Sequence, residues 1–343
     1  MHPVKLFCHI GTPHTHAETL HAALSEQRDW LEARGIAYGD AGSKALDHDP
    51  LWVACAMDVP AKGKLYGVTN RADQTAFRDA LTAKLAEERR ALEGQADRMI
   101  LSAPALTGQM FHPDAIARLK SMLEPVFDEI TLVVYVRRQD DAILAGYEAT
   151  VRTGTFLEPF EAYVRACLSQ PSPLPYLTYR RELMKWCEVW GPERIVLRRF
   201  SNTDFIGGSL LGDFMGVVQE SWQPDLAGLE PVSATPPISA PALEMLRRLQ
   251  SEARFPQNEE AEAALAALPH LPRPVMPAAL SLDIMLHFEV ANRWLKETFA
   301  PDLDGAFFPD RPDHPHHGNL GQLTVDDAVA VTQAMLGLTG DTG

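Results

Sequence analysis

Residues 9–24, HIGTPHTHAETLHAAL, place four histidines in and around a turn that could hold an anion. An apolar run, residues 4–10, precedes the turn, and the apolar residues that follow from Thr19 have helical spacing. Backbone N–H groups and the dipole at the start of such a helix favour a negatively charged ligand. The sequence therefore predicts an anion site at a turn between a strand and a helix.

Thr15 and Glu18 offer an alternative use for the same N–H groups. They have the T-x-x-E spacing of a capping box, in which both side chains satisfy free N–H groups at a helix start. A helix capped in this way keeps fewer N–H groups for an anion and carries a negative charge in its first turn. The sequence alone leaves both uses of the turn open.

The histidines also suggest a metal site. His9, His14, His16 and His21 lie close together in the sequence, and residues 313–317, DHPHH, supply further imidazoles. A metal-dependent hydrolase is therefore a lesser alternative. On a helix, the two-residue spacing of His14 and His16 would place their side chains about 200° apart, so it suits only a loop. We expect no metal, with His9 in the core and His21 on the helix surface.

Arginines end two of the predicted strands. Residues 129–138, EITLVVYVRR, and 194–200, RIVLRRF, are apolar runs of this kind. Alternation along a strand directs Arg137 and Arg138 to opposite sides, so one of the two faces a ligand. We assign that role to Arg137, with a structural ion pair as the alternative.

Predicted strands alternate with predicted helices along the first two thirds of the chain. The strands cover residues 4–10, 98–103, 129–138 and 194–200, and residues 36–42 form a further short strand that runs into a loop. Helical patterns between them, such as residues 73–94, predict right-handed crossovers and an α/β fold of three layers, with a mainly parallel sheet between helices. In such sheets ligands bind beyond the carboxyl ends of the strands, which brings together the turns after Ile10, Ala103, Arg137 and Arg199.

A change of pattern near residue 220 predicts two parts. Residues 1–220 form the α/β core, and residues 221–343 form a proline-rich connection and a helical extension packed on that core. Within the extension, helical patterns cover residues 245–255, 259–268 and 281–299.

Composition narrows the class of protein. The net charge of −15 and the pI near 5.2 argue against a general nucleic-acid surface. No stretch approaches the roughly 18–20 apolar residues of a membrane-spanning helix, and the N-terminus lacks the pattern of a secretory signal. Four scattered cysteines without a C-x-x-C motif suggest neither a zinc site nor a disulfide framework. We expect a cytoplasmic protein that binds neither membrane nor nucleic acid.

Several motifs, taken together and in order, resemble bacterial sulfotransferases of the P-loop-like class, which use 3′-phosphoadenosine 5′-phosphosulfate (PAPS). That family opens with a strand and H-I-G-x-x-K-T-G-T-[ST]-[ST]-L, and residues 9–20, HIGTPHTHAETL, follow this frame without a gap. Further stretches occur in the family's order: ILSAPAL (100–106), YVRRQDDAILAGY (135–147), PYLTYRRELMKWCEVWG (175–191), IVLRRF (195–200), GGSLLGDFMG (207–216) and HFEVANRWLKETF (287–299).

The resemblance implies transfer of a sulfuryl group from PAPS to a hydroxyl or amine of an acceptor, such as a carbohydrate or small metabolite. It implies that Arg137 holds the 3′-phosphate and that His14, at the position of the family's lysine, acts in catalysis. The implied PAPS-binding residues of the loop are Thr12, Pro13, His14, Thr15, His16, Ala17, Glu18 and Thr19.

The chain departs from the family at several implied positions. His14 replaces a lysine, His16 a glycine, Ala17 a hydroxyl residue, and Glu18 places a carboxylate where the family has a hydroxyl. Outside the loop, two more residues replace groups of the family: Ala145 for the 3′-phosphate serine and Pro104 for a glutamate after the third strand. A non-catalytic or repurposed binding protein on the same scaffold is therefore the main alternative to an enzyme.

Overall fold

A computed structural model describes residues 3–43, 47–110, 112–169, 172–201, 203–219, 238–251, 271–311 and 315–335. The chain forms two compact units. A sheet unit comprises Met1–Arg137, Thr178–Ala234 and Ala291–Phe307, and a helical unit comprises Arg138–Leu177, Thr235–Val290 and Phe308–Gly343. This division differs from a single boundary near residue 220, because the helix that follows Arg138 packs against helices from the C-terminal third.

Five parallel strands form the sheet, in the order β2-β3-β1-β4-β5. Their bounds are β1 (Lys5–His9), β2 (Ile36–Tyr38), β3 (Arg98–Ser102), β4 (Glu129–Arg137) and β5 (Ile195–Phe200). The predicted parallel sheet is confirmed, and β1 occupies its centre. His9 is in register with Ser102 of β3 and Val133 of β4, so β1 and β3 end side by side while β4 continues four residues further, to Arg137.

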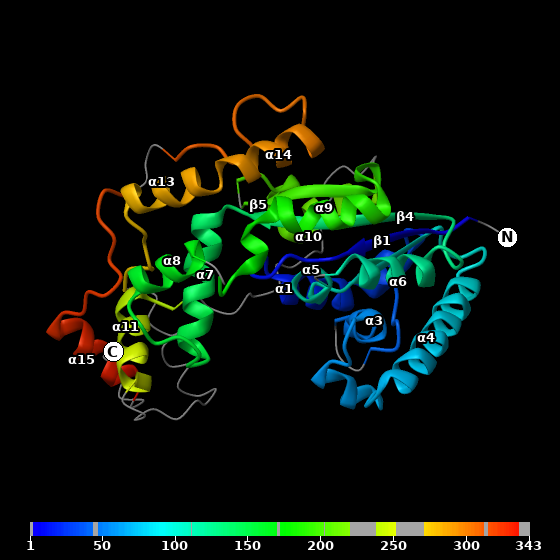
Figure 1. Ribbon diagram of the computed structural model, residues 1–343, viewed down its shortest axis with the longest axis horizontal. Coiled ribbons are helices and arrows are strands. Elements are labelled where there is room, and N and C mark those ends of the chain that lie inside the picture. Colours follow the sequence, from blue (N-terminus) through cyan, green and yellow to red (C-terminus); the bar gives the residue numbers. More distant parts are fainter. Residues whose placement is uncertain are drawn as a thin grey trace. The chain divides into compact units, whose positions relative to one another are not determined.

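Helices flank this sheet on both faces (Figure 1). The helices of the sheet unit are α1 (Ala17–Glu26), α2 (Arg28–Glu32), α3 (Asp49–Cys55), η1 (Ala61–Tyr66), α4 (Arg71–Ala91), α5 (Ala105–Gln109), α6 (Pro113–Leu123), α9 (Tyr179–Trp190), η3 (Pro192–Arg194), η4 (Ile206–Gly208), α10 (Leu210–Val218) and most of α14 (Glu289–Phe299).

Alternating side chains of the strands supply the core on each face. Phe7, Ile100 and Val133 pack with Leu24 of α1 and Phe214 of α10 in one cluster. The intervening strand positions, such as Leu6, Cys8, Leu101, Leu132 and Val134, are fully buried as well. Strands covered on both faces carry continuous apolar runs, which is why the strand predictions match the observed elements closely.

The helical unit contains α7 (Gln139–Arg152), α8 (Phe160–Leu168), η2 (Pro175–Leu177), α11 (Ala240–Ser251), α13 (Ala278–His287) and α15 (Val325–Met335). In it, α7 packs against α8, α11 and α13. The helix predicted over residues 281–299 is two helices, α13 and α14, because the backbone turns at Phe288 (φ −97°, ψ 7°). The helix predicted at 259–268 lies outside the described residues.

Within the parts of the chain that the structure describes, every helix is too short or too polar to span a bilayer.

Candidate functional site

The turn after β1 is held against β4 by four hydrogen bonds. The N–H of Ile10 donates to the carbonyl of Val133 (2.9 Å), and that of Tyr135 donates to the carbonyl of Gly11 (2.8 Å). Thr12 donates twice to the carbonyl of Tyr135, from its N–H (3.0 Å) and from its Oγ1 (2.9 Å). The backbone of the β1–α1 turn, residues 10–16, is therefore fixed at the carboxyl edge of the sheet.

Gly11 is required by this arrangement. It has a φ of 115°, which side chains on L-residues rarely adopt, and a Cβ there would lie 2.7 Å from the carbonyl oxygen of Pro104 and closer still to Thr107 Oγ1. Pro13 packs beside Gly108 of α5, since a Cβ on Gly108 would lie 3.2 Å from the Pro13 ring. The helix α5 and the residue before it, Pro104, thus pack against the turn.

The first turn of α1 keeps unused donors. His16, in the left-handed conformation (φ 52°, ψ 43°), is the N-cap and makes no side-chain cap hydrogen bond. The N–H groups of Thr19 and Leu20 donate to the carbonyl of His16, whereas those of His16, Ala17 and Glu18 have no acceptor among the described residues. Three backbone donors at a helix start therefore remain for an anion.

The capping-box interpretation of the turn is wrong. Thr15 Oγ1 donates to the carbonyl of Thr12 (2.5 Å) instead of accepting from the helix, because the left-handed His16 moves the helix start beyond Thr15. Glu18 is exposed, and its carboxylate accepts no hydrogen bond from the described main chain. The turn is not closed by its own side chains.

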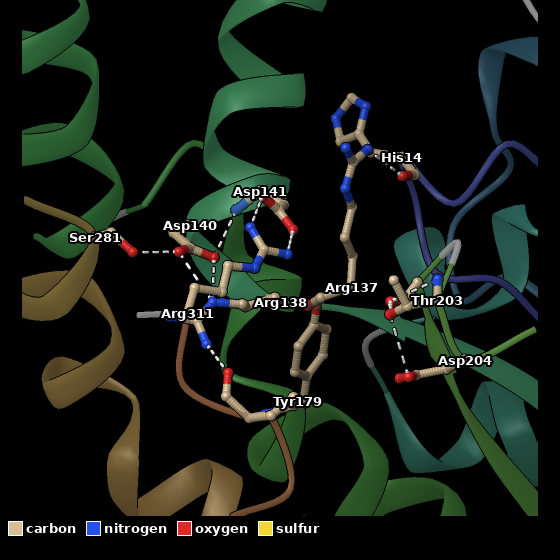
Figure 2. A network of polar contacts seen from close by, with 12 residues as sticks. His14, Arg137, Arg138, Asp140, Asp141, Tyr179, Thr203, Asp204, Ser281 and Arg311 are labelled. Atoms are coloured by element: carbon tan, nitrogen blue, oxygen red, sulfur yellow. Dashed lines mark hydrogen bonds and ion pairs between the residues drawn. The ribbon is translucent and has the colours of Figure 1, made fainter. Parts of the chain in front are cut away.

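Arg137 brings a permanent positive charge to the turn (Figure 2). It ends β4, and its Nη1 donates to the carbonyl of His14 (3.1 Å), as the labelled pair in Figure 2 shows. Its guanidinium also lies 5.5 Å from the ring centroid of Phe200, and its own carbonyl accepts from Tyr179 Oη (2.6 Å). The structure therefore brings Arg137 together with the predicted loop.

Arg138 points into the helical unit, as strand alternation predicts. Its Nε lies 3.0 Å from both carboxylate oxygens of Asp140, which also accepts from Ser281 Oγ (2.5 Å). Asp141 pairs with Arg311 in the same network (Figure 2). These contacts join the start of α7 to α13 and to the segment after Phe308, so Arg138 has a structural role.

Burial and the positive charge of Arg137 lower the pKa of both histidines of the turn. Burial, together with the charges of Arg137 and His16, lowers the pKa of His14 to about 4. The pKa of His16 is lowered by burial and by Arg137, and is raised in part by the carboxylate of Glu18. The His16 ring stacks on Phe200 with centroids 5.3 Å apart.

A second group of histidines meets at the end of β3. His9 Nδ1 lies 2.7 Å from Ser102 Oγ, and His21 Nε2 lies 2.8 Å from the same oxygen. His48 Nδ1 accepts from the N–H of Ser102 (2.9 Å), while its Nε2 donates to the carbonyl of Gly39 (2.8 Å). We call His9, His21, His48 and Ser102 the histidine hub; all four are buried.

The histidine hub corrects the expectation for His21. His21 faces the sheet and not the helix surface, because Ser102 offers it a buried hydrogen-bond partner. His9 and His21 each lie within hydrogen-bond distance of Ser102 Oγ, and among the described residues no three His, Cys, Asp or Glu side chains are grouped to hold a metal ion. Asp313 and His314 lie outside the described residues. Sequence reasoning did not find the roles of Ser102 and His48.

The two implied positions outside the loop, Pro104 and Ala145, lie in different units, and Arg198 is a further arginine near the end of a strand. Pro104 is the N-cap of α5 and donates nothing to the turn. Ala145 lies on α7 in the helical unit. Arg198, at the end of β5, binds the buried carboxylate of Asp213, which also accepts from Tyr135 Oη (2.8 Å), so this arginine is structural.

No protein-family model matches the chain, and no curated protein matches it. Solved structures similar to it include a sulfotransferase from Alicyclobacillus acidocaldarius, with 11% identity over 87% of this chain and 96% of that one and a TM-score of 0.43. The sulfotransferase domain of the Synechococcus PCC 7002 olefin synthase has 15% identity over 84% and 94% of the two chains (TM-score 0.35). A sulfotransferase domain of the curacin biosynthetic pathway has 12% identity over 84% and 98% (TM-score 0.31). Identities this low leave the chemistry of this chain to its own residues.

Proposed function

We propose that this chain is a sulfotransferase-like enzyme that takes PAPS as its donor and transfers the sulfuryl group to a hydroxyl or amine. The acceptor we propose is a carbohydrate or small metabolite. The observation that carries the proposal is the group of unused N–H donors of His16, Ala17 and Glu18 beside Arg137, within the motif that resembles the family's PAPS loop.

The donor set of the turn fits the anionic end of such a nucleotide. Three N–H groups at the start of α1 and the guanidinium of Arg137 supply hydrogen bonds and positive charge to phosphate oxygens. The exposed position of Glu18 leaves its carboxylate free to turn toward solvent and away from a bound anion. Thr12 and Thr15 do not add side-chain donors, because both hydroxyls already donate to carbonyls of the fold.

When bound, PAPS supplies a sulfuryl group joined to a phosphate leaving group. The N–H groups of residues 16–18 would stabilise the negative charge that grows on that phosphate during transfer. His14 takes the place of the family's lysine beside Arg137, which donates to its carbonyl, and as an imidazolium it would donate a proton or hydrogen bond to the leaving oxygen.

A cytoplasmic location belongs to this proposal. The four cysteines are unpaired, with Cys8, Cys55 and Cys167 buried and Cys187 half-buried, as suits a reducing compartment. We propose partners limited to small-molecule or carbohydrate acceptors, without nucleic acid or membrane.

Calorimetric titration with adenosine 3′,5′-bisphosphate tests the donor site directly. We expect binding by the wild-type chain and an affinity on the order of tenfold weaker for Arg137→Ala, because a charge-assisted hydrogen bond contributes about 1.5 kcal/mol or more. Arg194→Ala is the matched control, since Arg194 precedes β5 and pairs with Glu124 at the other end of that strand. No detectable heat at millimolar nucleotide would end the proposal.

A non-catalytic binding protein on the same scaffold is the second candidate. Pro104 favours it, because this residue caps α5 where the family has a carboxylate that could accept a proton. The two candidates separate by turnover: nucleotide binding together with sulfuryl transfer from PAPS to a panel of sugars and phenols supports the enzyme. Binding without transfer supports the binding protein.

A further inference from the structure

His14 and His16 flank the unused donors of the β1–α1 turn. Both have left-handed backbone conformations, with φ values of 60° and 52°, and only Thr15 separates them. One of the three unused N–H groups belongs to His16 itself, and His14 is two residues before it. An anion that accepts from the N–H groups of residues 16–18 therefore binds next to both histidines in the chain. An opposite charge within about 4–6 Å favours the charged form of a titratable group.

The groups that face these two imidazoles come from four elements. The turn supplies the other histidine, α1 supplies Glu18, the end of β4 supplies Arg137, and β5 supplies the ring of Phe200. The helix α5, which packs under the turn, carries no titratable side chain over Ala105–Gln109. Arg198 and Arg199 of β5 are paired with Asp213 and Asp204. Arg137 is thus the permanent cation nearest to both imidazoles among the described residues of these elements.

We propose that an anion entering the β1–α1 turn takes up a proton with it, and that His14 and His16 carry this proton. The inference rests on the proposed function, because it concerns the same donor site. One permanent cation and one carboxylate leave the site with little net charge, so a bound dianion draws protons from solvent onto the two imidazoles. A lysine at position 14 would need no such uptake, since its usual pKa is about 10.4.

Proton uptake gives the site a definite dependence on pH. Without an anion, burial and Arg137 keep the pKa of His14 near 4, so the imidazole is neutral at higher pH. A bound anion raises that pKa. Between the two values the bound form holds one more proton than the free form, so affinity rises about tenfold for each unit by which pH falls, per proton taken up. Above the raised pKa the dependence disappears.

Calorimetry with two probes tests this proposal on the full chain without an affinity tag. Inorganic sulfate is the first probe, because a phosphate itself titrates near pH 6, and adenosine 3′,5′-bisphosphate is the second. Titrations at about pH 5.5, 6.5 and 7.5, each in two buffers of different ionisation enthalpy, give the number of protons bound. We expect sulfate to bind more tightly as pH falls and to take up protons from the buffer.

Variants assign the uptake to residues. His14→Gln and His16→Gln should each reduce the number of protons taken up, and His14→Lys should bind anions at about pH 7.5 with fewer protons than the wild type. His317→Gln, at an exposed position in the helical unit, is the control and should leave uptake unchanged.

Three other outcomes are informative. Nucleotide binding with no proton uptake, and sulfate affinity that does not change with pH, would overturn this inference and leave the proposed function intact. Sulfate binding with uptake but no nucleotide binding would support the proton coupling and end the PAPS proposal. No binding of either probe at any pH would overturn both.

Discussion

The β1–α1 turn and the histidine hub are both rich in histidine, and they differ in what their hydrogen-bonding groups face. In the hub, Ser102 links the imidazoles of His9 and His21, and the described network is nearly closed, with His9 Nε2 as a buried atom that has no partner. In the turn, three backbone N–H groups remain without acceptors, next to Arg137. Most polar groups of the hub find their partners within the protein, whereas the N–H groups of the turn can bind a ligand.

Burial lowers the pKa of histidines in both regions, but its consequences differ between the hub and the turn. Burial lowers the pKa of His9 to about 3 and that of His21 to about 4, and burial also lowers that of His14 to about 4. His9 and His21 of the hub bond the hydroxyl of Ser102, which requires no charge on the imidazole, so both remain unprotonated. The imidazole of His14 can regain a proton when a negative charge arrives, so a histidine's role here is decided by its neighbours.

The largest expected effect is a loss of stability when the central hydroxyl of the hub is removed. Ser102→Ala leaves His9 Nδ1 and His21 Nε2 buried without their partner, and each unsatisfied buried group costs about 1–3 kcal/mol. We expect the free energy of unfolding to fall by roughly 2–3 kcal/mol, measured by urea denaturation at pH 7.

Ser121→Ala is the matched control for Ser102→Ala. The Ser121 hydroxyl is exposed and donates to the carbonyl of Arg118, so its removal should change the free energy of unfolding by less than about 0.5 kcal/mol. Equal stability of the two variants would show that the hub does not hold the sheet and α1 together.

Acid should weaken the hub as well, by a smaller amount per pH unit. The pKa of His9 and His21 is lowered in the folded state, so the unfolded chain binds protons first as pH falls below about 6.5. Their stabilising contribution is complete above that pH and is lost toward about pH 4 for His21 and about pH 3 for His9. We expect a slope of about 1.4 kcal/mol per pH unit for each histidine.

The variant His21→Gln separates this slope from that of the carboxylates. Glutamine retains a group that can bond Ser102 Oγ but does not titrate, so denaturation at about pH 7 and about pH 5 should show a smaller difference in the variant than in the wild type. An identical difference in both chains would assign the acid sensitivity to other groups.

The sheet could be predicted from the sequence because its strands are covered on both faces. Continuous apolar runs such as residues 129–138 mark buried strands, and their alternation with helical patterns predicts parallel pairing. The break between α13 and α14 could not be predicted, since the backbone turns at Phe288 without a proline or glycine to mark it. The grouping of residues 138–177 with the C-terminal helices depends on packing between distant segments, which periodicity does not encode.

The candidate site, like the fold, could be predicted from the sequence only in part. The turn and Arg137 follow from local pattern plus one rule, that neighbouring parallel strands end at the same edge. The hub depends on side chains separated by 93 residues (His9 and Ser102) and 54 residues (His48 and Ser102), and nothing local shows that they meet. The capping-box prediction was wrong because a left-handed histidine displaced the helix start, and that conformation is uncommon for a residue other than glycine.

The smallest expected effect is a change in the affinity of the turn for an anion. Glu18→Gln removes an exposed carboxylate from the first turn of α1, where negative charge competes with a bound anion for the helix dipole. We expect adenosine 3′,5′-bisphosphate to bind about 2–3-fold more tightly at low salt, since a charge near a helix terminus contributes about 0.3–1 kcal/mol. Calorimetry at two salt concentrations measures the gain, which salt should screen.

Glu26→Gln, at the opposite end of α1, is the control for Glu18→Gln and should leave nucleotide affinity unchanged. The same substitution at position 18 also removes the one charge that raises the pKa of His16, so proton uptake by that imidazole must then come from the anion alone. Weaker binding by Glu18→Gln would contradict this competition, and with it the binding of the anion by the N–H groups of residues 16–18.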